Sequence, residues 1–203
     1  MGSAVIGVLV MAAAVFGVSA TSKLRNPAAY RLFRTAIEET GLLPRAWLAR
    51  ASALVAAAEA ITTALLAAAA VLMCAGAAGA VLITRVALLL AALLMAVLIL
   101  GVAGVMRRGV RASCPCFGTA SELPLGMPHL IRNLVLGSML LLALGGSVVA
   151  RPGAPVPDSA LAIVAGLTLA LLLIRTEDLA VLLVPATAAG RSSGGQRARR
   201  DAP

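Results

Sequence analysis

Two cysteines separated by one proline are the residues of this sequence best suited to carry chemistry. They lie in the pentapeptide Cys114-Pro115-Cys116-Phe117-Gly118, between two long apolar runs, in a chain with 3 cysteines in all. Such close thiols can form a small disulfide ring if the backbone bends enough to bring their Cα atoms within about 7 Å. The ring should be strained, and strained disulfides are oxidising, labile bridges. The pair therefore predicts reversible thiol–disulfide exchange.

The residues around the pair favour this chemistry. Pro115 restricts its own φ and the conformation of Cys114, and Gly118 leaves the backbone free to approach a partner. Basic side chains and the positive N-terminal end of a following helix should raise the fraction of nucleophilic thiolate. The basic residues are Arg107, Arg108 and Arg111.

Two other interpretations of the cysteines stay open. In the first, the two cysteines have no chemical role; in the second, they bind a soft metal, because thiolates select Cu(I) and Zn(II). Cys-Pro-Cys also occurs within the membrane in copper-pumping ATPases, but this chain has no ATPase domain and its motif lies outside the apolar runs. We expect Cys74 to be a small buried apolar residue. His129, the only histidine, is expected at the membrane interface rather than as a metal ligand.

The composition predicts an integral membrane protein. Hydrophobic residues make up 61% of the chain and charged residues 12%, and the mean hydropathy is +1.02. The apolar residues form long blocks without the alternation of barrel strands. Aromatic residues are scarce, and Ala and Leu dominate, which favours closely packed helices. We therefore predict an all-α, polytopic helix bundle with four to five transmembrane helices.

Five segments are candidate spans, judged against about 20 residues for a bilayer core. The first resembles a secretory signal, but no basic residue precedes it, so we expect it to be retained. The fifth is short and either spans or lies in the interface. Residues 1–185 then form the transmembrane domain, and 186–203 a disordered basic tail. The spans are 3–20, 52–75, 81–106, 129–150 and 159–174.

Residues 21–50 are too polar to span and predict an interfacial helix after the first span. Tyr30, Phe33, Ile37 and Leu42 recur at helical spacing, with charged residues between them. We expect the helix to end at the turn residues that follow, Gly41 and Pro44.

The basic residues predict the orientation, because cytoplasmic loops collect Lys and Arg. With the first loop inside, alternation leaves only Arg85 and Arg151 of the 17 Lys and Arg residues outside. We therefore expect a multi-pass plasma-membrane protein whose C-terminus and cysteine loop are cytoplasmic. The net charge of +9 is explained by the basic residues that orient the protein in the membrane and by their contact with lipid headgroups. It does not require a nucleic-acid partner.

This orientation brings several unusual residues to one leaflet, where they join the cysteine pair. Glu59 lies about 10 Å along its helix from residue 52, deep enough to need a partner, and Lys23 is a suitable one. The same leaflet receives Arg132 and Asn133. Simpler roles are open for each: a structural ion pair for Glu59 and Lys23, a topology signal for Arg132, and a helix cap or bridge for Asn133.

Taken together, these residues resemble the methylamine-utilisation MauE family, within the wider DoxX/DoxD-like group of redox-associated membrane proteins. The resemblance covers about residues 3–150, and Pro115 departs from the Gly common in the family. The matching residues are Ser22-Lys23-Leu24-Arg25-Asn26-Pro27, Leu43-Pro44, Glu59, the loop Cys114-Pro115-Cys116-Phe117-Gly118, and Arg132-Asn133.

The resemblance implies thiol–disulfide exchange beside a thioredoxin-like partner, in the maturation of a disulfide-rich dehydrogenase subunit. We expect Cys114 and Cys116 to exchange disulfides, and by chemical analogy a membrane quinone to carry electrons while Glu59 and Lys23 manage protons and charge. Pro115, Phe117, Gly118, Arg132 and Asn133 would support the site. A non-catalytic scaffold for a redox partner and a copper- or zinc-handling protein remain alternatives. If the pair exchanges disulfides catalytically, the protein would be a thiol–disulfide oxidoreductase.

Overall fold

The computed structural model describes residues 2–109, 126–153 and 155–175, and these are helical with no strand. The predicted all-α helix bundle is confirmed. Six helices follow one another along the described chain. They are α1 Gly2–Leu24, α2 Pro27–Glu39, α3 Arg45–Ala75, α4 Ala80–Arg107, α5 Met127–Gly146 and α6 Val156–Ile174.

Five of the described helices are long and apolar enough to cross a membrane, namely α1, α3, α4, α5 and α6. The shortest, α6, has 19 residues, close to the roughly 20 that a bilayer core requires. The fifth candidate segment, which the sequence alone left either spanning or interfacial, therefore has the length of a membrane span. The chain is a multi-pass membrane protein.

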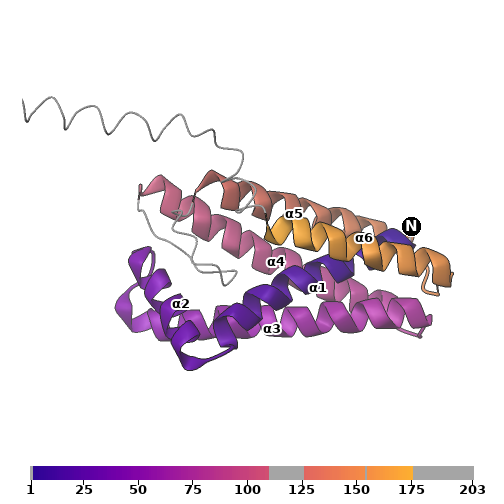
Figure 1. Ribbon diagram of the computed structural model, residues 1–203, viewed down its shortest axis with the longest axis horizontal. Helices are drawn as coiled ribbons and strands as arrows, with labels where there is room; N and C mark the ends of the chain where they lie inside the picture. The colour runs from indigo at the N-terminus through magenta and orange to yellow at the C-terminus, as the bar shows by residue number, and fades with distance from the viewer. Residues whose placement is uncertain (1, 110–125, 154, 176–203) are drawn as a thin grey trace, which may run out of the picture.

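Helix α1 lies in the middle of the bundle, packed along α3 and α6, while α4 packs against α3 and α5. Small residues let α1 and α6 approach closely: a Cβ added at Gly166 would collide with the carbonyl oxygen of Gly7. Because the successive long helices α1, α3, α4 and α5 run in alternating directions, α1 ends, α3 begins, α4 ends and α5 begins at the same end of the bundle (Figure 1). We call this the α2 end.

Helix α2 confirms the amphipathic helix predicted after the first span. The side chain of Asn26 accepts a hydrogen bond from the backbone N–H of Ala29 at 2.7 Å, which caps the helix, and Pro27 occupies its first turn. Phe33 is buried beneath the helix while Arg31 and Arg34 are exposed.

Three helix boundaries differ by four residues or more from those expected. Helix α3 begins at Arg45 instead of residue 52, because Pro44 precedes its first turn and does not interrupt it. Helix α1 continues to Leu24, so Lys23 lies in its last turn. Helix α5 ends at Gly146 instead of residue 150. Cys74 is partly buried against the core rather than fully enclosed.

Candidate functional site

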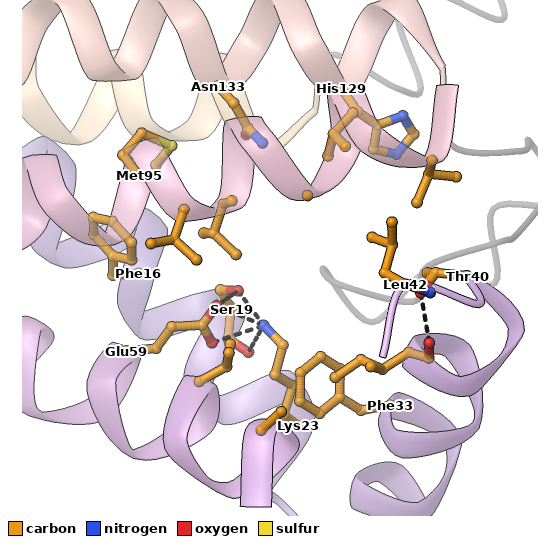
Figure 2. A pocket seen from close by; sticks show the side chains of 18 of the residues that line it. Phe16, Ser19, Lys23, Phe33, Thr40, Leu42, Glu59, Met95, His129 and Asn133 are labelled. Atoms are coloured by element: carbon orange, nitrogen blue, oxygen red, sulfur yellow. Dashed lines mark hydrogen bonds and ion pairs between the residues drawn. The ribbon is translucent and has the colours of Figure 1, made fainter. Parts of the chain in front are cut away.

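A cavity of about 350 Å³ lies at the α2 end, between α1 and α3 on one side and α4 and α5 on the other (Figure 2). Its walls are mainly apolar, with Phe16 of α1, Val55 of α3 and Met95 of α4 among the lining residues. The polar lining residues come from two opposite walls. The cavity is therefore an apolar space between transmembrane helices with polar groups on two sides.

One wall carries a buried ion pair between α1 and α3. The Nζ atom of Lys23 lies 2.7 Å from Oε2 and 2.8 Å from Oε1 of Glu59. Their residues are only 2% and 1% exposed, so water cannot stabilise either charge. Breaking such a pair on one side leaves an uncompensated buried charge. The pair therefore holds α1 and α3 together at this depth.

Ser19 completes the hydrogen bonding of the pair. Its Oγ accepts a hydrogen bond from Lys23 Nζ at 2.6 Å and donates one to Glu59 Oε1 at 3.2 Å. With both carboxylate oxygens and this hydroxyl, all three N–H donors of the ammonium have acceptors. The group is a closed network of a cation, an anion and a hydroxyl.

Helix α2 covers this network from the end of the bundle. The Phe33 ring centroid lies 5.0 Å from Lys23 Nζ, within the range of a cation–π interaction. The hydroxyls of Tyr30 and Ser52 lie 3.1 Å apart in a hydrogen bond that joins α2 to α3. These contacts hold the amphipathic helix over the ion pair.

The opposite wall is formed by the first two turns of α5. His129, Arg132 and Asn133 are all buried and line the cavity, because a spacing of three and four residues places them on one helix face. Figure 2 shows His129 and Asn133 across the cavity from Glu59 and Lys23. Arg132 is near enough to act electrostatically on Lys23. The described charged lining residues, Lys23, Arg132 and Glu59, sum to one positive charge.

The connection between α2 and α3 borders the cavity and is bound to α4. Leu42 and Leu43 line the cavity, and the Nη1 atom of Arg108 donates a hydrogen bond to the Gly41 carbonyl oxygen at 2.7 Å. A Cβ added at Gly104 of α4 would lie 3.2 Å from Leu42 Cδ2. Leu42 was expected on the face of the interfacial helix; it lies after α2 ends, because Gly41 turns the chain at a positive φ of 62°.

The family model described as methylamine utilisation protein MauE matches residues 1–146. The chain belongs to the MauE family. No curated protein and no solved structure matches it. The MauE match includes α1 to α5 and so contains every wall of the cavity, whereas α6 follows it.

The geometry confirms that Lys23 pairs with Glu59 in this MauE protein and places Arg132 and Asn133 at the same cavity. What these four residues do in a reaction stays a prediction. The cysteine loop, with its own supporting residues Pro115, Phe117 and Gly118, lies outside the described residues, as does the tail 186–203. The loop residues are Cys114, Pro115, Cys116, Phe117 and Gly118.

Ser19 and His129 are polar lining residues that were not assigned to the site from the sequence. Ser19 precedes Lys23 by four residues, and this helical spacing could have indicated that they share a face. His129 was expected at the interface, but it is 4% exposed because α5 begins at Met127 and turns it inward with Arg132 and Asn133. Among the described residues no group of three His, Cys, Asp or Glu side chains is placed to hold a metal ion.

Proposed function

We propose that this MauE-family membrane protein carries out thiol–disulfide exchange through Cys114 and Cys116 with a thioredoxin-like partner. The family description links it to methylamine utilisation, and maturation of a disulfide-rich dehydrogenase subunit is the process that the family resemblance implies. The observation that carries the proposal is the position of the Cys-Pro-Cys motif, in the segment between α4 and α5. Those two helices form one side of the cavity.

The length of the chain limits where the thiols can be. Cys114 follows Gly109, the last described residue after α4, by five residues, so it lies within about 18 Å of it. The end of α4 is itself attached to the α2–α3 connection through Arg108 and Gly41. This limit supports the proposal that the pair works near the α2 end of the bundle, together with a water-soluble partner.

The exchange conserves atoms and electrons. A thiolate of the partner attacks the Cys114–Cys116 disulfide and forms a mixed disulfide, releasing one thiolate of the pair. The second partner thiolate then attacks the mixed bond, so that the partner leaves with a disulfide and the pair becomes a dithiol. Two electrons have passed to this protein, and two protons accompany them. The reverse sequence reduces the partner.

The distribution of basic residues supports a cytoplasmic position for the α2 end at the plasma membrane. Only Arg85, near the start of α4, and Arg151, before α6, among the described basic residues belong to the opposite end. Cytoplasmic thiols are generally kept reduced. The side of the membrane on which the pair lies therefore shows whether the exchange takes place in a reducing compartment. A membrane-impermeant maleimide added to right-side-out vesicles should leave Cys114 unlabelled and label it after the vesicles are opened. Labelling of intact vesicles would contradict this orientation.

Thiol trapping tests the exchange itself. In a Cys74→Ser background, membranes are equilibrated at defined thiol–disulfide potentials and the remaining thiols are alkylated with a mass-tagged maleimide. We expect both thiols to become protected together as the potential rises, because they form one disulfide. Single variants, Cys114→Ser and Cys116→Ser, are the matched controls and should stay reactive. Alkylation of both thiols at every potential would show that the pair does not cycle.

A trapped complex tests the partner. A thioredoxin-like protein lacking its second active-site cysteine should form a mixed disulfide with the full-length protein, and the Cys114→Ser/Cys116→Ser variant should form none. If that double variant supports maturation of the dehydrogenase subunit as well as the unmodified protein does, the cysteines are dispensable and the protein acts as a scaffold.

A further inference from the structure

The cavity opens on the side of α3 and α4. Its lining residues from α1 and α5 are all buried, whereas Val97 of α4 is 58% exposed and Leu43 of the α2–α3 connection is also exposed. Residues that both line a cavity and are exposed lie at its mouth. Val97 lies about 15 Å along α4 from Arg107, and α3 and α4 are candidate spans. The mouth therefore opens toward the hydrocarbon part of the bilayer.

The interior of the cavity suits a hydrocarbon chain. The lining surface is almost entirely apolar, and every lining residue of α4 is apolar or glycine. The three N–H donors of Lys23 and the hydroxyl of Ser19 are already used within the ion-pair network. An apolar cavity of roughly 150 Å³ is enough for benzene, so about 350 Å³ accommodates a longer apolar segment. A polar ligand would lose its hydrogen bonds to water on entering.

The rim of the mouth is basic. Arg108 follows α4 and donates one hydrogen bond to the carbonyl oxygen of Gly41 at 2.7 Å, next to Leu42 of the lining. This bond uses one of the five N–H donors of an exposed guanidinium. Over residues 21–50 and 107–109, the exposed charged side chains are seven arginines and two glutamates. The surface around the mouth therefore attracts phosphate groups, which Arg binds through paired N–H donors.

An aromatic side chain lies at the same level as the basic rim. Trp47, the only tryptophan of the chain, is exposed in the first turn of α3, one turn before Ala51 of the cavity lining. The guanidinium carbon of Arg50 lies 5.8 Å from the centroid of its ring. Trp and Arg side chains favour the boundary between lipid headgroups and acyl chains. The mouth therefore begins near the headgroups and continues into the hydrocarbon.

We propose that the cavity holds one acyl chain of an anionic phospholipid whose phosphate binds Arg108 at the rim. The apolar interior accepts the chain, and the excess of exposed arginines complements the charge of the headgroup. Such a lipid binds only the folded protein and so stabilises it. The proposal goes beyond disulfide exchange and involves no thiol, so the Cys114→Ser/Cys116→Ser variant should bind the lipid as the unmodified protein does.

The single tryptophan gives a direct readout of lipid binding. Phosphatidylglycerol with brominated acyl chains, titrated into the full-length protein in detergent, should quench Trp47 fluorescence to saturation. Phosphatidylcholine with the same chains has no net charge and should bind about tenfold more weakly. Equal affinity for the two lipids would overturn the proposal. Displacement of the brominated lipid by millimolar inorganic phosphate would also overturn it, because the site would then bind a free anion.

Gly101→Leu tests the position of the acyl chain. Gly101 lines the cavity one turn after Val97, and an added Cβ there would meet no atom within 4 Å. Leucine should fill part of the cavity and weaken binding of brominated phosphatidylglycerol about tenfold. Gly145 of α5 is exposed with equal space around an added Cβ, so Gly145→Leu is the matched control and should bind normally. Equal affinity of the two leucine variants would place the chain outside the cavity and overturn the proposal.

Arg108→Gln tests the position of the headgroup independently of the cavity. Loss of one surface arginine should weaken phosphatidylglycerol binding about fivefold and leave phosphatidylcholine binding unchanged. Arg151→Gln removes the same charge from an exposed residue at the opposite end and should have no effect. Equal weakening by both glutamine variants would show that only net charge matters, which would overturn the assignment of Arg108. Helicity and thermal unfolding of each variant in detergent show that it is folded.

Discussion

The two ends of the helix bundle are built differently. At the end opposite α2, α1 and α6 meet at Gly7 and Gly166 with almost no space between their backbones. At the α2 end the same α1 is separated from α5 by a cavity, and it carries Lys23 into a buried ion pair. One end gains stability from close packing. The other end gives up packing for an internal space with charged walls, as expected of a functional site.

The largest effect should come from breaking the ion pair at the α2 end. Glu59→Ala leaves the Lys23 ammonium buried without its carboxylate, which should lower the free energy of unfolding by about 3–5 kcal/mol. The double variant Lys23→Met/Glu59→Leu removes both charges and should recover most of this loss. Unfolding in detergent titrations measures both. If the double variant is as unstable as the single one, the unpaired buried charge is not the cause of the lost stability.

A smaller effect is expected from the tightly packed end. Gly166→Ala places a methyl group against the Gly7 carbonyl oxygen, so α1 and α6 must separate at a cost of about 1–3 kcal/mol. Gly145→Ala adds the same methyl group where nothing lies within 4 Å and should be close to neutral. Thermal unfolding of the two alanine variants provides the comparison. Equal stability would mean that the contact between α1 and α6 is not tight.

The smallest effect should come from an exposed ion pair at the same end as the buried one. Arg45 Nε lies 3.2 Å from Glu38 Oε1, but the Arg45 side chain is 90% exposed, so water and salt screen the interaction. Arg45→Gln should change unfolding stability much less than Glu59→Ala. A loss comparable to that of Glu59→Ala would show that burial does not distinguish the two pairs.

The membrane class and the pairing of Lys23 with Glu59 were accessible from the sequence. A carboxylate within an apolar run needs a partner, and alternation of the spans left few basic residues near its depth. Helix starts were less accessible: the second span was expected to begin at residue 52, but α3 begins at Arg45, directly after Pro44, since proline is tolerated at the start of a helix. That shift changes which residues belong to α3 and which to the interfacial segment.

Composition and charge determined by themselves that this chain is a multi-pass helical membrane protein, because apolar length and basic loops act locally along the chain. Tertiary structure alone decided that Ser19, Phe33 and Leu42 meet around one cavity and that His129 turns inward. Such contacts depend on the rotation of each helix about its axis and on how closely neighbouring helices pack. Those quantities are set by many side chains acting together, and no single stretch of sequence contains them.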